Sequence, residues 1–182
     1  MHKEALDVPF TPFHWGIALF FYGLLGIWVD PIAMFIGVII PDIEGILVFF
    51  NVFGIQGALH GPLHSPVGII VDGIIVFFLS TGIWIVLRRL ISHPMIKSKP
   101  HLIFTLFWSF FAPFSHVLLD LPLYQDISLF WPIIPTNFNP LYGIVSAGLP
   151  YLLCTILGVV GLVLISIRFI FYSRRQAKLE ER

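Results

Sequence analysis

Long apolar runs, each of about the length that crosses a membrane, take up most of this chain. A helix needs about 20 predominantly apolar residues to span the hydrocarbon core of a bilayer. Of the 182 residues 58% are hydrophobic and 11% are charged, with a mean hydropathy of +0.95. A soluble domain of this size could not keep that composition in water. The sequence therefore predicts an all-α, polytopic membrane helix bundle, a single domain over residues 1–172 followed by a basic tail at 173–182.

Prolines and polar residues divide the apolar sequence into about five membrane-spanning helices. Thr11 and Ser65 are the predicted N-caps of the first and third helices, each followed by a proline at the first helical position. Pro113 is predicted to kink the fourth helix, and Pro150 to divide the apolar segment 141–172 into a short outer piece and a membrane helix. The predicted helices cover residues 13–29, 31–50, 66–87, 102–121 and 150–171.

Positive charge is concentrated in two places, which predicts the orientation. Nearly all Lys and Arg residues lie in segments 88–99 and 174–182, and such segments stay on the cytoplasmic side of the cell membrane. With five spans, the N-terminus is then outside and the C-terminus is cytoplasmic. No basic patch interleaved with aromatic residues is present, so the sequence does not indicate a nucleic-acid partner. Cys154 is the only cysteine and can form no internal disulfide.

Two acidic residues, Asp42 and Glu44, interrupt the second apolar segment. A carboxylate at membrane depth costs several kcal/mol unless it is compensated, which makes it a candidate functional residue. The segment 31–50 contains no Lys or Arg. Either the acids are protonated or bonded to backbone where Pro41 breaks the helix, or a cation comes from elsewhere in the molecule.

Histidines fall on the same predicted outer side as these acids. His116 and Asp120 are four residues apart, so their side chains share one helix face, and His60 and His64 have the same spacing. Neutral imidazoles and carboxylates are ligands that Zn²⁺ prefers and that Mn²⁺ or Fe²⁺ accept. We therefore expect a site for a divalent metal, zinc before manganese or iron, with one or more ions near the outer face. His14 belongs to this group, although a lone histidine there is also typical of the membrane interface. Asp72, about two turns into the third helix, is interpreted as structural.

The order of these motifs resembles a known family. An early His, then Pro-Asp-Ile-Glu, then His-Gly-Pro-Leu-His-Ser, then His-Val-Leu-Leu-Asp is similar to the YdjM-like family of membrane-bound metal-dependent hydrolases, and the opening Pro-Phe-Thr-Pro-Phe-His resembles its archaeal members. Glu44 stands where the family has a second Asp, and Pro62 stands near its basic residue. A looser likeness connects the His/Asp layout with zinc-dependent phospholipase C. The resemblance implies metal-ligand roles for His14, Asp42, His60, His64, His116 and Asp120.

These observations predict a metal-dependent hydrolase that acts on a phosphoester or phosphoanhydride of a lipid-linked substrate. Glu44 is the expected general base, because it is the acid least needed as a ligand. Ser65, at a helix N-terminus, is expected to bind the anionic group. Tyr124 and Trp131, in a proline-rich loop, are expected to cap the site and contact lipid chains, although an interfacial aromatic belt is an equal interpretation of that loop. The alternatives are a metal-binding or transport protein without hydrolase activity and a scaffold whose metal holds helices together.

The orientation is testable by labelling single cysteines in a Cys154→Ser background. We expect a cysteine at position 97 to react only with reagents that enter the cell, because the positive charges around it favour the cytoplasmic side. Labelling of position 97 from outside would contradict both the orientation and the shared side of the predicted ligands.

Overall fold

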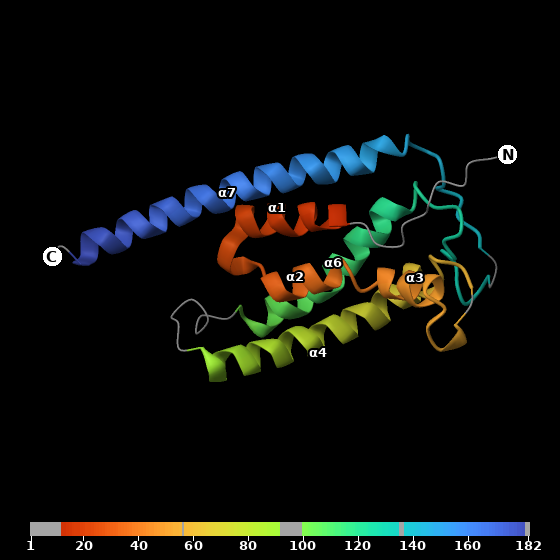
Figure 1. Ribbon diagram of the computed structural model, residues 1–182, viewed down its shortest axis with the longest axis horizontal. Helices are drawn as coiled ribbons and strands as arrows, with labels where there is room; N and C mark the ends of the chain where they lie inside the picture. Colours follow the sequence, from red (N-terminus) through yellow and green to blue (C-terminus); the bar gives the residue numbers. More distant parts are fainter. Residues whose placement is uncertain (1–11, 56, 92–99, 135–136, 181–182) are drawn as a thin grey trace.

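The protein is a bundle of helices (Figure 1). The computed structural model describes residues 12–55, 57–91, 100–134 and 137–180, excepting the side chains of 177–180, and these ranges contain no strand. The prediction of an all-α membrane bundle is confirmed. The α-helices are α1 (Trp15–Leu25), α2 (Pro31–Gly37), α3 (Asp42–Phe49), α4 (Pro66–Leu90), α6 (Leu102–Asp120) and α7 (Gly148–Glu180), and short 3₁₀ turns cover Pro12–His14, Gly26–Trp28, Val52–Gly54 and Pro62–His64.

The second apolar segment is broken, and the prediction of one helix over 31–50 is wrong. It forms α2 and α3, which are bent by 41° across the break. Pro41 immediately precedes α3. A proline has no backbone N–H and its ring clashes with the preceding helical turn, so a helix cannot continue through it undistorted. The break makes Asp42 the first residue of α3 instead of a mid-helix residue.

The last helix also differs from its prediction. Pro150 is the third residue of α7 and does not divide it, because the first turn of a helix tolerates proline. The helix also continues through residue 180, so it includes most of the segment 173–182 that was predicted as a separate basic tail. Ser65 caps α4 as predicted, and Pro113 lies inside α6. The predicted N-cap Thr11 lies outside the described residues.

Three to four of the apolar helices are able to span a membrane. α4, α6 and the range Gly148–Gln176 of α7 are each long and apolar enough, and the bent pair α2–α3 adds a fourth if it counts as one span. The first apolar helix, Pro12–Trp28, is shorter than these. The protein is therefore consistent with a membrane protein, and the fifth span and the orientation remain predictions.

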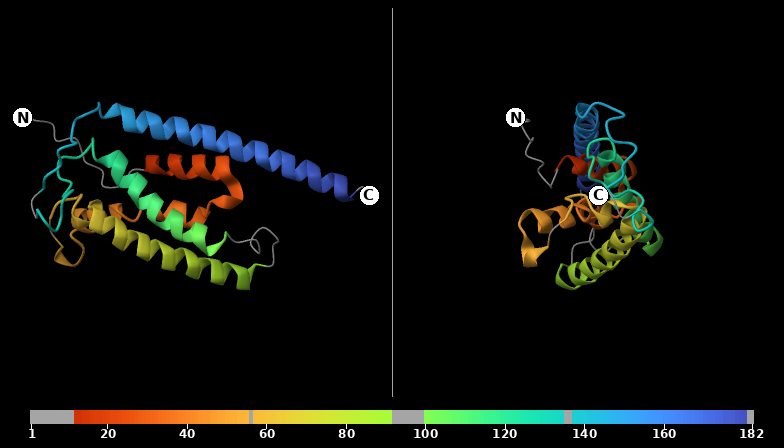
Figure 2. Two further views of the ribbon diagram at one scale, coloured as in Figure 1. Left: turned by 180° about the vertical axis from the view of Figure 1, so that it is seen from behind. Right: turned by 90° about the vertical axis from the view of Figure 1, so that its right-hand side faces the viewer.

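Small residues allow α1 and α7 to lie side by side (Figures 1 and 2). A side chain on Gly23 would meet the backbone of Gly161, and a side chain on Gly16 would meet the backbone of Cys154. Close approach through small residues is a usual way for membrane helices to associate. On the other side of the bundle, α6 packs between α2 and α4.

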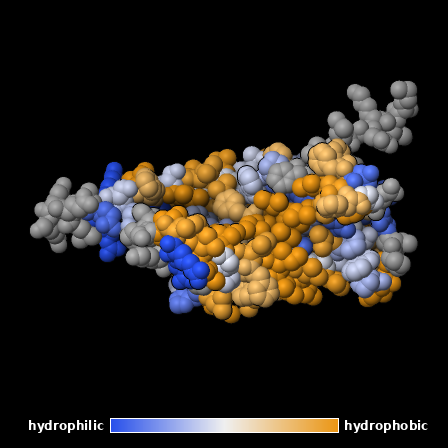
Figure 3. Space-filling model, turned by 60° about the horizontal axis from the view of Figure 1, so that its bottom comes forward, coloured by the Kyte–Doolittle hydropathy of each residue, from blue (hydrophilic) through white to orange (hydrophobic). Residues whose placement is uncertain are grey.

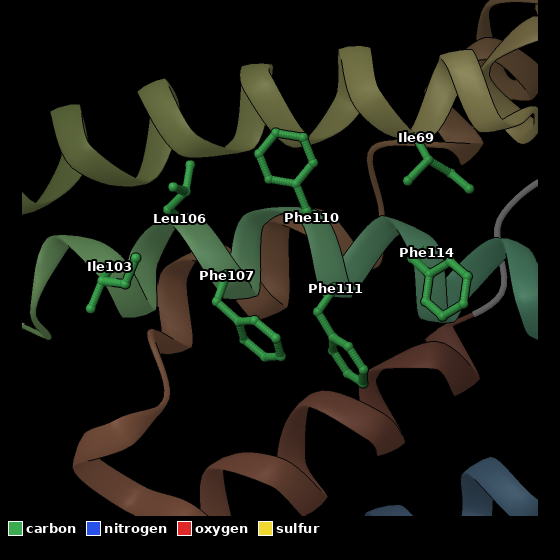
Figure 4. Close-up of a pocket in the computed structure, with 7 residues that line it drawn as sticks. All are labelled: Ile69, Ile103, Leu106, Phe107, Phe110, Phe111 and Phe114. Atoms are coloured by element: carbon green, nitrogen blue, oxygen red, sulfur yellow. The ribbon is translucent and has the colours of Figure 1, made fainter.

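An apolar band occupies the middle of the surface, and polar residues gather at its two ends (Figure 3). Within this surface α6 carries a groove of about 720 Å³ (Figure 4), lined by Ile69, Ile103, Leu106, Phe107, Phe110, Phe111 and Phe114. Phe107 precedes His116 by nine residues, or about two and a half helical turns, so the two side chains leave α6 on opposite sides. Ile103, Leu106 and Phe114 are exposed like Phe107, so the groove lies on the apolar surface and away from His116.

Asp30 joins α2, α4 and α6 near the end of the bundle where α4 and α7 carry their arginines. It is fully buried and accepts hydrogen bonds from Ala33 N (3.1 Å), Ser80 Oγ (3.1 Å), Trp84 Nε1 (3.1 Å) and Thr105 Oγ1 (2.6 Å). These donors come from α2, α4 and α6. The carboxylate therefore caps α2 and binds two further helices to it through neutral donors, and no described cationic side chain contacts it.

We expect Asp30→Ala to destabilise the protein by at least about 2 kcal/mol, because each buried donor left without an acceptor costs roughly 1–3 kcal/mol. Thermal unfolding in detergent would measure the loss. Ser166→Ala is the control, since Ser166 is exposed and bonds only Leu162 O of its own helix. An unchanged melting temperature for Asp30→Ala would show that this network does not hold the helices together.

Candidate metal centre

Four side chains from three parts of the chain meet at the end of the bundle opposite Asp30. Each offers one ligand atom, and these atoms all lie within 4.8 Å of one another. The four residues are at most 2% exposed. They are Asp42 at the start of α3, His64 at the end of the 3₁₀ turn Pro62–His64, and His116 and Asp120 on α6.

Local sequence explains why these side chains converge. His116 and Asp120 share a face of α6 because they are four residues apart. Asp42 is brought to them by the break at Pro41. His64 directly precedes Ser65, whose Oγ accepts a hydrogen bond from Gly68 N (3.0 Å) and donates one to Pro62 O (2.7 Å). That double contact closes the turn on which His64 lies.

His116 is at the centre of the group. Its Nε2 lies 3.0 Å from Asp120 Oδ2 and 3.3 Å from Asp42 Oδ1, and Asp120 Oδ2 is also 3.7 Å from His64 Nε2. Ligands around a tetrahedral ion with bonds of about 2.05 Å are separated by roughly 3.3 Å. These three separations lie on both sides of that value, and the other pairs of ligand atoms lie within 4.8 Å.

A hydrogen bond fixes which nitrogen of His116 faces the acids. Nδ1 lies 2.8 Å from Val38 O, and because a carbonyl can only accept, Nδ1 carries the proton. In a neutral imidazole Nε2 then presents a lone pair. A neutral His116 would turn this lone pair toward two carboxylates, which a metal ion between them would satisfy, whereas a protonated His116 would donate Nε2–H to them.

Buried polar atoms without partners gather at this point. Asp42 Oδ2, both ring nitrogens of His64, His116 Nε2 and both oxygens of Asp120 have no hydrogen-bond partner within the described part of the chain. Each such atom costs free energy if nothing else binds it. A metal ion would satisfy several of them at once, because it accepts lone pairs from nitrogen and oxygen together.

The donor set fits a divalent cation. Two carboxylates supply two negative charges, and imidazole binds a metal only when it is neutral. His64 meets this condition, because burial lowers its pKa to about 4. The buried Asp/His/His/Asp group could therefore hold a metal ion.

His14 extends the group. Its Nε2 is 3.2 Å from Asp120 Oδ1, and its ring stacks on that of His116 with centroids 4.0 Å apart. Asp120 thus presents one oxygen to the four-residue group and the other to His14. A carboxylate placed in this way can bridge to a second ion or be oriented by the histidine.

His60 is held differently from the other predicted ligands. Its Nδ1 lies 2.9 Å from Asp126 Oδ1, its backbone N donates to Asp126 Oδ2 (3.2 Å), and its ring stacks on Tyr124 at 3.8 Å. Burial opposes ionisation of Asp126, but the hydrogen bonds from His60 outweigh it and hold the pKa of that carboxyl below its usual value. The His60 ring also contacts that of His64, with centroids 4.9 Å apart. His60 lies beside the four-residue group and is not one of its members.

Glu44 supports the loop that carries the histidines. Its Oε2 accepts a hydrogen bond from Leu63 N (2.9 Å). A side chain on Gly61 would come within 2.5 Å of Glu44 Oε1, so the absence of a side chain there allows the loop to approach the carboxylate. The structure thus gives Glu44 a positioning contact that sequence analysis did not anticipate.

The three predicted substrate-binding residues differ in what their side chains contact. The Ser65 hydroxyl is engaged in capping α4. Tyr124 is half-buried against His60, and burial raises the pKa of its hydroxyl. Trp131 lies further along the loop and makes no ring contact or hydrogen bond with the four-residue group.

Asp72 is fully buried, and neither of its oxygens has a hydrogen-bond partner among the described residues.

Comparisons with known protein families, curated proteins and solved structures found no match. The resemblance to the YdjM-like family is therefore supported only by the motif residues themselves and stays a prediction.

Sequence analysis missed two acids that the structure makes prominent. Asp126 lies in an irregular loop with no helical period, so nothing in the sequence pairs it with a histidine 66 residues earlier. In the sequence Asp30 is an acid before a proline at the start of a helix. This pattern indicates an N-cap and does not predict a contact with α4 and α6.

The metal centre is testable by elemental analysis of protein purified without chelator. We expect a tightly held transition-metal ion in the wild type and its loss from a variant with both His116→Ala and Asp120→Ala, because two of the four ligand groups are then gone. His101→Ala is the matched control, since His101 is an exposed histidine at the opposite end of α6. Wild-type protein without bound metal would contradict the assignment.

Proposed function

We propose that this protein is a membrane-embedded, metal-dependent hydrolase of a phosphoester or phosphoanhydride in a lipid-linked substrate. The observation that carries the proposal is the buried group of Asp42, His64, His116 and Asp120, whose ligand atoms lie within 4.8 Å of one another and several of whose polar atoms have no hydrogen-bond partner among the described residues. Zinc is the preferred ion for two imidazoles and two carboxylates, with manganese or iron as alternatives. When bound, such an ion supplies Lewis acidity and lowers the pKa of a coordinated water.

The chain's own residues orient this centre and supply groups around it. Val38 O holds His116 with Nε2 toward the acids, and His14 contacts the second oxygen of Asp120. In the same way Asp126 holds His60 by Nδ1, which leaves Nε2 of a neutral imidazole as an acceptor. His60 is thereby available to hydrogen-bond a substrate or water beside the centre.

A lipid-linked substrate suits the position of the centre. The ligands are carried by or adjoin apolar helices, at one end of the band that spans the molecule. A substrate that stays in the membrane would present its polar group at this level without leaving the lipid. The loop after α6, with Tyr124 against His60, is placed to cover that group.

The second candidate is a metal-binding protein without hydrolase activity, in which the ion only joins α3, α6 and the start of α4. It is favoured by the number of protein ligands, because four complete a tetrahedral site and leave no position for water. Chelation separates the two functions. A structural ion predicts that metal removal lowers helix content or the melting temperature, whereas the hydrolase predicts loss of phosphate release that is restored by the ion.

Glu44→Gln tests the assignment of the general base. Gln keeps an oxygen that can accept from Leu63 N, so the loop and the metal content should stay unchanged. If Glu44 transfers the proton, release of phosphate from lipid phosphates in detergent should fall by roughly two to four orders of magnitude.

Glu44→Ala is the companion variant, because it removes both the acid and the loop contact. A Glu44→Gln protein that hydrolyses at the wild-type rate while Glu44→Ala loses metal would assign Glu44 to positioning alone. His60 would then be the next candidate for the base. Wild-type protein that retains its metal but releases no phosphate from any lipid phosphate would favour the second candidate function.

A further inference from the structure

A second polar feature lies at the opposite end of the bundle from the metal centre. A pocket of about 510 Å³ opens between the end of α1, the start of α2, the later part of α4 and the last apolar turns of α7. Among the described residues its walls are mostly apolar or aromatic, with Arg168 as the one charged side chain. The residues used below are Tyr22, Trp84, Ile165, Arg168, Phe169 and Tyr172.

Arg168 is held in place at this pocket. Its Nη2 donates a 2.7 Å hydrogen bond to Leu24 O at the end of α1. Gly26 has a φ of +59°, and a side chain there would collide with the Arg168 guanidinium. The backbone conformation of Gly26 favours glycine, and the absence of a side chain there leaves room for the guanidinium beside the turn after α1.

The charge of Arg168 has no partner of opposite sign among the described residues. A guanidinium has five N–H donors, and the hydrogen bond to Leu24 O uses one of them. Asp30 directly follows Val29, a residue of the pocket wall. Its carboxylate is fully buried, however, and accepts hydrogen bonds from Ser80, Trp84 and Thr105. Four donors of Arg168 are thus available to a ligand.

Further positive charge surrounds this end of the molecule. Arg88 and Arg89 end α4, and Arg174 and Arg175 follow Arg168 on α7. Basic pockets between membrane helices at such an end bind anionic lipid headgroups. The apolar walls fit the hydrocarbon part of a lipid, because Ile165 and Phe169 lie on turns of α7 that are apolar enough to be in the membrane.

We propose that this pocket binds an anionic phospholipid, with the phosphate on Arg168 and a hydrocarbon chain against Ile165 and Phe169. Guanidinium and phosphate form paired, charge-assisted hydrogen bonds. Tyr22 and Tyr172 combine an apolar ring with a hydroxyl, as the boundary between headgroup and hydrocarbon requires. The site is independent of the metal centre and of the reaction proposed for it.

Binding of short-chain lipids to metal-loaded protein in detergent, followed by native mass spectrometry, tests the proposal. Wild-type protein should retain phosphatidylglycerol about tenfold more tightly than phosphatidylcholine, because both lipids carry a phosphate but the positive choline of phosphatidylcholine is repelled by the charge of Arg168. Arg168→Gln should abolish this preference and Arg168→Lys should keep part of it. Arg174→Gln removes the same charge from the exposed end of α7, outside the pocket lining, and should reduce the preference much less than Arg168→Gln.

Two further measurements separate the lipid site from its alternatives. Ile165→Trp fills the pocket while retaining Arg168, and it should weaken retention of phosphatidylglycerol. Inorganic phosphate should not displace the lipid at concentrations that do not disturb the micelle. Equal retention of the two lipids by wild-type protein, an unchanged preference in Arg168→Gln, an equal loss in Arg174→Gln or displacement by free phosphate would each overturn the proposal.

Discussion

A carboxylate buried among apolar helices must be hydrogen-bonded, protonated or paired with a cation, and this protein depends on that constraint at both ends of its bundle. At one end Asp30 receives hydrogen bonds from neutral donors on α2, α4 and α6. At the other end Asp42 and Asp120 face the Nε2 of His116, whose Nδ1 donates to Val38 O. Among the described residues, Asp30 is satisfied by neutral donors. Asp42 and Asp120 lie instead among histidines, in a group that could hold a metal ion.

Helix breaks place the groups of the metal centre. Pro41 makes Asp42 the first residue of a new helix, and the cap at Ser65 fixes the turn that ends at His64. Glu44 binds the preceding loop through Leu63 N, and Asp126 draws the loop after α6 onto His60. Irregular backbone at membrane depth requires such contacts, because no water is available for its polar groups. The same contacts give the site its geometry.

The sequence was sufficient for features that depend on local rules. The apolar runs predicted the helical bundle, Ser-Pro predicted the start of α4, and the spacing of His116 and Asp120 predicted their shared face. The sequence could not determine contacts between distant segments, such as His60 with Asp126 or Thr105 with Asp30. Pro150 and Pro41 illustrate the difficulty, since one is tolerated in a first turn while the other separates two helices. His60 was grouped with the ligands by spacing, whereas in the structure its Nδ1 is occupied by an acid that carries no pattern in the sequence.

X-ray absorption at the edge of the metal found in purified protein tests the central claim most directly. The structure predicts only nitrogen and oxygen neighbours at about 2.0–2.2 Å, with the scattering pattern of two imidazole rings and no sulfur. A sulfur neighbour at about 2.3 Å would place the ion at Cys154 instead. A shell of oxygen without imidazole scattering would mean that His64 and His116 do not bind it, and either result would contradict the metal centre described above.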